Sequence, residues 1–211
     1  MTQFDKAEKV SAVVLDVYGT IAAITDTRNP FGKLLRFGEL QGRAKTPQDR
    51  MTLMTQAISL SEAATVLGIA LTDRQLEELK ADLQAELASI ELYPEVLSTI
   101  HALQDRGIKV ALCSNLAAAY APPITRLLPM TLDVYTWSFE ARSLKPDPAI
   151  YDTVCRRLQC LPQQVLMIGD TQKADVDGPR AFGMQAIRID RRTADDNAEK
   201  ISSLNGLFKL L

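Results

Sequence analysis

The sequence predicts an α/β protein with a Rossmann-like parallel-sheet core and a helical cap domain inserted into that core. Short apolar runs alternate with amphipathic segments along most of the 211 residues, a pattern typical of parallel strands connected by helices. One long stretch, residues 21–92, interrupts this alternation with helical patterns and no convincing strand. We therefore expect residues 1–20 and 93–211 to form the core and residues 21–92 to form the cap.

Five apolar runs are expected to form the sheet. The first, Ser11–Asp16, is apolar almost throughout and ends in a carboxylate, as expected for a strand with both faces buried in a parallel sheet. The other four runs are similar in length and composition: Lys109–Cys113, Val134–Trp137, Val165–Ile168 and Gln185–Ile189. Because helical segments separate most of these runs, we expect the strands to lie parallel to one another.

Three helices are expected between the strands of the core: Pro94–Gln104, Asp147–Leu158 and Ala174–Phe182. Pro94 begins the first helix and Gly107 follows its end, and these are favoured positions for the two residue types. Gly183 ends the third helix in the same way. A further short helix, Ser202–Leu211, is expected to pack back on the core.

The cap is expected to contain at least three helices. Thr72–Ile90 has an amphipathic pattern with leucines on one face: Leu76, Leu79, Leu83 and Leu87. Thr72 is a suitable N-cap residue for this helix, and Gln75 occupies the capping-box position. Pro47–Gln56 and Ser61–Leu67 indicate two more helices.

Composition and charge limit the classes of partner. Hydrophobic residues make up 46% of the chain and charged residues 24%, which is typical of a globular protein. The net charge is −2 and the basic residues are scattered, so neither nucleic acid nor an anionic membrane is an expected partner. No apolar run is long enough to cross a bilayer, and Met1–Val10 lacks the apolar core of a signal peptide. We therefore expect a cytoplasmic protein; the sequence does not indicate its oligomeric state.

The cysteines and the single histidine give no metal-binding pattern. The three cysteines form no CxxC pair, and His101 lies on an expected helix away from the strand ends. A zinc site built from Cys and His is therefore not expected. An odd number of cysteines without a disulfide framework fits a reducing compartment.

Polar residues gather at the carboxyl ends of the expected strands, where open parallel sheets bind their ligands. These residues are Asp16, Ser114-Asn115, Lys145-Pro146, and Gly169-Asp170-Thr171 with Asp175. Carboxylates that meet at one point repel each other unless a cation or a proton intervenes. Because the nearby ligands offer only oxygen, Mg²⁺ is the cation that the sequence predicts.

These residues resemble, in order, the four motifs of the haloacid dehalogenase (HAD) superfamily. The quoted segments are Asp16-Val17-Tyr18-Gly19-Thr20, Ser114-Asn115, Lys145-Pro146 and Gly169-Asp170-Thr171 with Asp175. Each motif is weak alone, but all four follow an expected strand, and the resemblance covers almost the whole chain. The helical insertion lies where that superfamily places its type 1 cap.

The resemblance implies a role for each catalytic position. Asp16 would attack the substrate and form a covalent aspartyl intermediate, a reaction available to carboxylates. Ser114 would donate a hydrogen bond to a substrate oxygen, and Lys145 would neutralise charge on Asp16 and on the substrate. Asn115, which follows Ser114, resembles the dehalogenase branch of the superfamily.

The resemblance also implies a metal site. Asp16 and Asp170 would bind Mg²⁺ directly, together with the backbone carbonyl of Tyr18. Asp175 would support the metal or its water ligands. A phosphoryl group held there would be stabilised by Mg²⁺ and by Lys145.

Tyr18 departs from the phosphatase pattern. Phosphatases of this superfamily usually carry a second Asp two residues after the nucleophile, where it protonates the leaving oxygen and then activates water. An unperturbed tyrosine has a pKa near 10 and is a poor base at neutral pH. Asp-x-Tyr-Gly-Thr resembles the L-2-haloacid dehalogenases instead, whereas Gly169-Asp170 resembles the Mg²⁺-dependent phosphatases.

Three functions are compatible with this mixture. The first is a Mg²⁺-dependent phosphohydrolase that acts on a small phosphorylated metabolite with a good leaving group, such as an acyl phosphate. The second is an L-2-haloacid dehalogenase in which Asp175 activates the water and a cap arginine binds the small acid; the candidates are Arg28, Arg36 and Arg43. The third is a binding protein that kept the fold and lost turnover.

Overall fold

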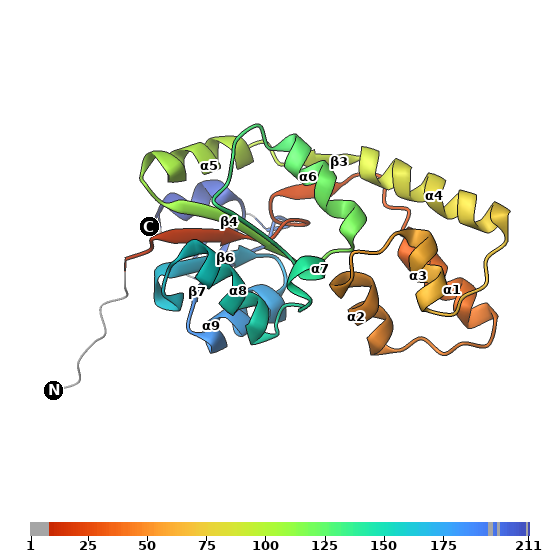
Figure 1. The fold of residues 1–211 in the computed structure, drawn as a ribbon. Coiled ribbons are helices and arrows are strands. Elements are labelled where there is room, and N and C mark those ends of the chain that lie inside the picture. The colour runs from red at the N-terminus through yellow and green to blue at the C-terminus, as the bar shows by residue number, and fades with distance from the viewer. Residues whose placement is uncertain (1–8, 194–195, 198, 210) are drawn as a thin grey trace.

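The computed structural model describes residues 9–193, 196–197, 199–209 and 211. Its central sheet has the strand order β5-β4-β1-β6-β7-β8, with every neighbouring pair parallel (Figure 1). The strands are β1 Ala12–Leu15, β4 Lys109–Ser114, β5 Val134–Trp137, β6 Val165–Gly169, β7 Gln185–Ile189 and β8 Lys200–Ile201. The α/β fold and the five expected strands are confirmed, and the short edge strand β8 is an addition to them.

Helices cover both faces of the sheet. Successive side chains of β1 point to opposite faces, and all of them are apolar and buried. Val13 and Leu15 belong to one hydrophobic cluster, and Ala12 and Val14 belong to another. The first cluster includes side chains from α5 Val96–Asp105, α6 Ala121–Leu127 and η4 Leu204–Lys209. The second includes side chains of α8 Pro148–Leu158, and α9 Gly178–Phe182 lies on the same side (Figure 1).

Short helical turns complete the core. They are η1 Ala118–Tyr120, α7 Ser138–Ala141, η2 Pro162–Gln164 and η3 Gln172–Asp177. The segment Ala174–Phe182, expected as one helix, is helical throughout but changes type along its length. The chain forms a π-helical turn, η3, before α9 begins at Gly178. The expected C-terminal helix is a 3₁₀ helix, η4, whose Leu204 and Leu207 are fully buried.

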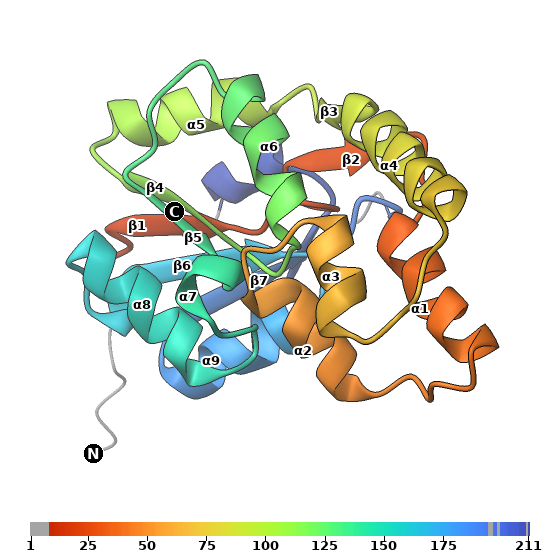
Figure 2. The same cartoon turned by 45° about the vertical axis from the view of Figure 1, so that its right-hand side comes forward.

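We call the segment from β2 to β3 the helical insert. It runs through β2 Ala22–Ile24, α1 Pro30–Leu40, α2 Pro47–Thr55, α3 Leu60–Val66, α4 Asp73–Ala88 and β3 Ile90–Leu92. Its four helices pack around their own hydrophobic cluster, which includes Leu34, Leu53, Leu60 and Leu79 (Figure 2). Thr72 caps α4, and Gln75 completes the capping box as expected.

The expectation that residues 21–92 contain no strand is wrong. β2 and β3 pair in antiparallel fashion, with Ala22 opposite Leu92 and Ile24 opposite Ile90. This pair forms where the insert leaves the core and returns to it. Three residues are too few to show a strand periodicity, so the sequence pattern does not reveal it.

Helix α1 is also absent from the sequence prediction. Asn29 caps it by accepting a hydrogen bond from Gly32 N at 3.1 Å, and Pro30 occupies the first helical position. Two glycines inside the segment, Gly32 and Gly38, lower its helix propensity. The helix forms because Leu34 and Leu35 are buried in the cluster of the insert.

The insert contacts the core directly at α2 and α7. The Ser138 hydroxyl at the start of α7 donates a hydrogen bond to the Met54 carbonyl of α2 at 2.7 Å. This contact keeps α2 close to the strand ends of the core (Figure 2). Within the described part of the chain, no helix has the length and hydropathy needed to span a bilayer.

Candidate active site

The structure brings the predicted carboxylates together at the strand ends. Asp16 follows β1, and its backbone N–H still bonds the Ile168 carbonyl of β6 at 2.8 Å, which fixes the start of the loop. Carboxylate oxygens of Asp16, Asp170 and Asp175 all lie within 4.8 Å of one another. Ser114 ends the neighbouring strand β4 and is buried. The site therefore forms at the sheet edge that the sequence predicts.

The Lys145 ammonium group is the cation of this cluster. Its Nζ donates to Asp16 Oδ1 at 2.7 Å, to Asp175 Oδ1 at 2.6 Å and to the Cys113 carbonyl at 2.7 Å. The side chain is 2% exposed. Burial lowers the pKa of Lys145, but the two carboxylates raise it by more, so the pKa lies above its ordinary value and the group stays charged.

Asn115 positions the Lys145 backbone rather than pointing into the carboxylate cluster. Its Nδ2 donates to the Lys145 carbonyl at 2.8 Å, and its Oδ1 accepts from the Lys145 N–H at 2.8 Å. These two bonds join the end of β4 to the loop before α8. The arrangement gives Asn115 a positioning role, through which it fixes the ammonium group beside Asp16.

Asp170 and Asp175 have different surroundings. Both oxygens of Asp175 are engaged, one by Lys145 Nζ and the other by the Thr171 N–H at 3.0 Å. The Asp170 carboxylate accepts from only one other described residue, through the Thr171 hydroxyl at 3.2 Å. Burial, followed by the charge of Asp16, raises the pKa of Asp170. Asp170 is therefore the carboxylate that an added cation would stabilise most directly.

Two glycines allow this close approach of carboxylates. Gly19 has φ +85°, and a Cβ at this residue would collide with the Asp170 carboxylate. A Cβ at Gly169 would collide with the Asp175 carboxylate. The glycines of the first and fourth motifs thus leave the space that the acidic side chains occupy.

Tyr18 donates its hydroxyl to the carbonyl of Tyr120, the last residue of η1, at 2.9 Å. The two rings meet edge to face with centroids 5.9 Å apart. Burial, then the charges of Glu86 and Asp16, raise the pKa of Tyr18 above its ordinary value. No described residue donates a hydrogen bond to the Tyr18 carbonyl, which leaves that oxygen available as a ligand.

A cavity of about 420 Å³ lies between the insert and the core. Tyr18 and Asn115 line it from the core side. Its apolar wall includes Ile24, Phe31, Leu35, Leu53, Met54, Leu116 and Ala117. Its polar wall includes Lys45, Arg50 and Glu86 from the insert. Asp16, Lys145, Asp170 and Asp175 do not line this cavity, which approaches the cluster through Tyr18 and Asn115.

The arginines considered from the sequence lie elsewhere. Arg28 is paired with Asp26, and Arg43 forms a two-pronged ion pair with Asp49. Arg36 is exposed on α1. None of the three lines the cavity between insert and core.

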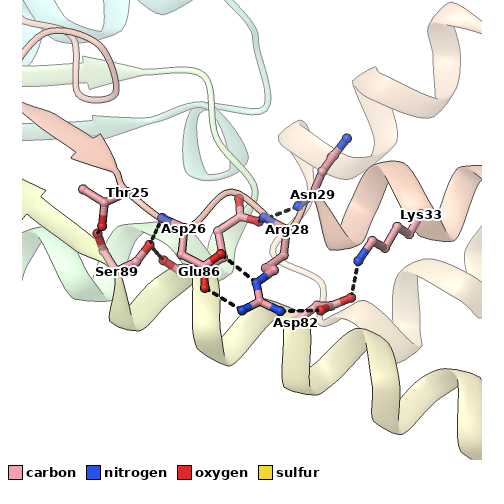
Figure 3. Close-up of polar contacts among 8 residues, drawn as sticks. All are labelled: Thr25, Asp26, Arg28, Asn29, Lys33, Asp82, Glu86 and Ser89. Carbon is pink, nitrogen blue, oxygen red and sulfur yellow. Dashed lines mark hydrogen bonds and ion pairs between the residues drawn. The ribbon is translucent and has the colours of Figure 1, made fainter.

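Glu86 is a site residue that sequence reasoning misses. It lies on α4 and is 4% exposed. One of its oxygens accepts from the N–H groups of Arg28 and Asn29, at 2.8 and 2.6 Å (Figure 3). The other accepts from the Tyr120 hydroxyl at 3.0 Å. Glu86 thereby joins α4 to the start of α1 and to the core. Its surroundings depend on tertiary contacts, for which the sequence contains no local signal.

Arg191 supports the first motif from the other side and is also absent from the sequence prediction. Its guanidinium donates to the Thr20 carbonyl and to Glu95 Oε1, the latter at 2.8 Å, and lies 3.5 Å from the centroid of the Tyr93 ring. Because Arg191 is 171 residues from Thr20, no motif connects them.

Comparisons with known proteins agree with this geometry. The family model described as haloacid dehalogenase-like hydrolase matches residues 10–183. (S)-2-haloacid dehalogenase 4A of Burkholderia cepacia is 26% identical over 226 residues, which cover 97% of this chain and 96% of the relative. Ribulose-1,5-bisphosphate 5-phosphatase of Halopiger xanaduensis is 26% identical over 117 residues, which cover 54% of this chain and 49% of the relative.

Solved structures show the same fold. The crystal structure of a HAD phosphatase from Thermococcus onnurineus superposes with a TM-score of 0.66 and 22% sequence identity, over 95% of this chain and 97% of that one. The sheet order, the ordered motifs and the family match lead to one conclusion. The chain belongs to the haloacid dehalogenase-like hydrolase family and is a hydrolase of the HAD superfamily.

Proposed function

We propose that this protein is a Mg²⁺-dependent phosphohydrolase that forms a covalent intermediate on Asp16. The observation that carries the proposal is the position of Asp170. Its carboxyl group lies beside Asp16, and no cationic side chain of the described residues binds it. Lys145 binds Asp16 and Asp175, so Asp170 is the carboxylate of the cluster whose charge an added cation would offset. A reaction in which Asp16 displaces halide from carbon does not require a carboxylate at the position of Asp170.

The donor set fits Mg²⁺. Asp16, Asp170 and the Tyr18 carbonyl offer oxygen ligands only, which this ion prefers. Asp175 is engaged by Lys145 and Thr171, so we assign it the support of Lys145 and of outer ligands. When bound, Mg²⁺ would neutralise negative charge on a phosphoryl group.

The residues of the chain account for the transfer. An Asp16 carboxylate oxygen attacks phosphorus, the bond from phosphorus to the leaving oxygen breaks, and the leaving group departs with the electron pair. Lys145 stabilises the charge on Asp16 and on the phosphoryl oxygens, and Ser114 donates a hydrogen bond to one of them. Water then attacks the phosphorus of the aspartyl phosphate, which releases phosphate and restores Asp16.

Tyr18 limits the choice of leaving group. Its hydroxyl is committed to the Tyr120 carbonyl and its pKa is raised, so it does not serve as the general base. Without a general acid, a poor leaving group would be cleaved ~10²–10⁴-fold more slowly. We therefore propose a small phosphorylated metabolite with a good leaving group, such as an acyl phosphate.

We also propose that residues 21–92 act as a cap over this site. The cavity is lined from both the insert and the core, and its core wall includes Tyr18, two residues after Asp16. The Glu86–Tyr120 and Ser138–Met54 hydrogen bonds hold the two parts together in the arrangement observed. Such a cover would exclude water while the intermediate forms.

L-2-haloacid dehalogenase is the second candidate, and two observations favour it. Tyr18 occupies the position found in the dehalogenase motif, and the (S)-2-haloacid dehalogenase relative aligns over nearly its whole length. In that reaction Asp16 would attack carbon and halide would leave without a proton. Asp170 would then need another explanation.

Product release with three substrates separates the candidates. Acetyl phosphate, p-nitrophenyl phosphate and L-2-chloropropionate are each incubated with Mg²⁺ or with EDTA, and the Asp16→Asn variant is the control. We expect phosphate release, fastest from acetyl phosphate, that EDTA and Asp16→Asn both abolish. Chloride release that is insensitive to EDTA would replace the phosphohydrolase with the dehalogenase.

A further inference from the structure

Two cations at the cavity between insert and core have no partner among the residues that the structure describes. Most basic side chains of the insert are paired with carboxylates: Arg28 and Lys33 with Asp82, Arg43 with Asp49, Arg74 with Glu78, and Lys80 with Glu77. Lys45 and Arg50 form no ion pair or hydrogen bond with any described residue. Both are exposed, and both line the 420 Å³ cavity.

Arg50 lies on the side of the cavity closest to the catalytic loop. It lines the main cavity together with Asn115 and Leu116. It also lines a second depression, of about 350 Å³, whose wall includes Lys145 and Pro146. Arg50 is therefore placed between the space under the insert and the loop that carries the catalytic ammonium group.

The single carboxylate in the cavity wall does not neutralise these cations. Glu86 already accepts hydrogen bonds from the Arg28 and Asn29 N–H groups (Figure 3) and from the Tyr120 hydroxyl. It forms no ion pair with Lys45 or Arg50 within 4.0 Å. The remaining wall is mainly apolar. The cavity thus combines an apolar surface with two unpaired positive charges.

We propose that Lys45 and Arg50 bind a second anionic group on the substrate, a carboxylate or a second phosphate. This inference rests on the proposed phosphohydrolase function and specifies its substrate class. The phosphoryl group lies at Asp16, a short apolar stem contacts the wall that includes Leu53 and Leu116, and the second anion meets the two cations. Arginine and lysine bind such oxyanions through charge-assisted hydrogen bonds.

A pair of non-hydrolysable phosphonates tests the proposal by binding alone. Propylphosphonate carries one anionic end, and 3-phosphonopropionate carries a carboxylate at the other end. Isothermal titration calorimetry in Mg²⁺ is expected to show roughly 10-fold tighter binding of 3-phosphonopropionate to the wild-type protein. 1,3-Propanediphosphonate, compared with 3-phosphonopropionate, shows whether phosphate or carboxylate is the preferred second group.

Variants test whether Lys45 and Arg50 cause the preference for 3-phosphonopropionate. The double variant Lys45→Gln/Arg50→Gln is expected to bind 3-phosphonopropionate and propylphosphonate equally, with propylphosphonate affinity unchanged. Arg36→Gln is the matched control, because Arg36 is an exposed cation of the same insert that does not line the cavity, and it should keep the preference.

Two results would overturn the inference while leaving the phosphohydrolase intact: equal wild-type affinity for both phosphonates in Mg²⁺, or a preference that survives in the double variant. If neither phosphonate bound in Mg²⁺, the proposed function would fail, and the inference with it.

Discussion

Lys145→Met tests the electrostatic balance of the buried cluster. Lys145 donates three hydrogen bonds of 2.6 to 2.7 Å, two of them to carboxylates, and its side chain is 2% exposed. Methionine has a similar length and no charge, so the substitution leaves Asp16 and Asp175 without their cation. Removing one partner of a buried ion pair costs about 3–5 kcal/mol of unfolding free energy. For a chain of this size that corresponds to a melting temperature roughly 6–20 °C lower.

The pH dependence of this loss has a definite sign. Burial already raises the pKa of Asp175 to about 6 in the wild type, and loss of the Lys145 charge raises it further above that of the unfolded chain. Between the carboxyl pKa of the unfolded chain and that of the folded variant, the folded variant therefore binds more protons. The stability of the variant consequently falls as the pH rises through this interval. We expect the difference from wild type to be largest at pH 8 and to shrink as the pH falls toward about 4.

Urea denaturation followed by circular dichroism, in EDTA at pH 8 and at pH 4.5, measures both quantities. Lys109→Met is the matched control, because Lys109 Nζ donates to the Leu158 carbonyl at 2.7 Å without a carboxylate partner. We expect that control to lose about 0.5–1.5 kcal/mol, with little change between the two pH values. A Lys145→Met loss below about 1 kcal/mol, or one that is equal at both pH values, would refute the reasoning.

Three further predictions concern turnover. Gly19→Ala should raise the Mg²⁺ concentration needed for half-maximal phosphate release at least 10-fold, because its Cβ enters the space of the Asp170 carboxylate; an unchanged Mg²⁺ titration would contradict this. Asn115→Ala should lower kcat about 10-fold with little effect on KM, since two bonds to the Lys145 backbone are lost; wild-type kcat would show that they do not position the ammonium group. Tyr18→Asp should speed alkyl phosphate hydrolysis by up to ~10²-fold and leave acetyl phosphate nearly unaffected; no gain in a folded variant would exclude this position as the limit.

The core of the fold was predictable because burial determines the composition of its strands. Val13, Leu15 and Val165 lie in a sheet covered on both faces, so their segments are apolar throughout. The rule that parallel strands present ligands at their carboxyl ends then places Asp16 and Asp170 together. Their grouping needed no knowledge of distances.

The insert was less predictable because tertiary contacts override its local signals. β2 and β3 are three residues each and exist through their mutual pairing. Helix α1 contains Gly32 and Gly38, and the burial of Leu34 offsets their low propensity.

The orientation of site residues could not be predicted either. The Tyr18 hydroxyl bonds the Tyr120 carbonyl, 102 residues away in the sequence. The cavity is lined by Lys45 and Arg50 and not by the arginines considered from the sequence. These orientations depend on the tertiary contacts that form in the folded chain. A single sequence contains no record of them.

The fate of oxygen from water tests the central claim most directly. Turnover of acetyl phosphate in H₂¹⁸O with Mg²⁺ is followed by mass spectrometry of the released phosphate and of the peptide that contains Asp16. An aspartyl phosphate is attacked by water at phosphorus, so the account predicts ¹⁸O in the phosphate and none in the Asp16 carboxylate. The same experiment with L-2-chloropropionate should leave Asp16 unlabelled. Chloride release with ¹⁸O in the Asp16 side chain would instead show an alkyl ester opened at the carboxyl carbon, and the phosphohydrolase assignment would be wrong.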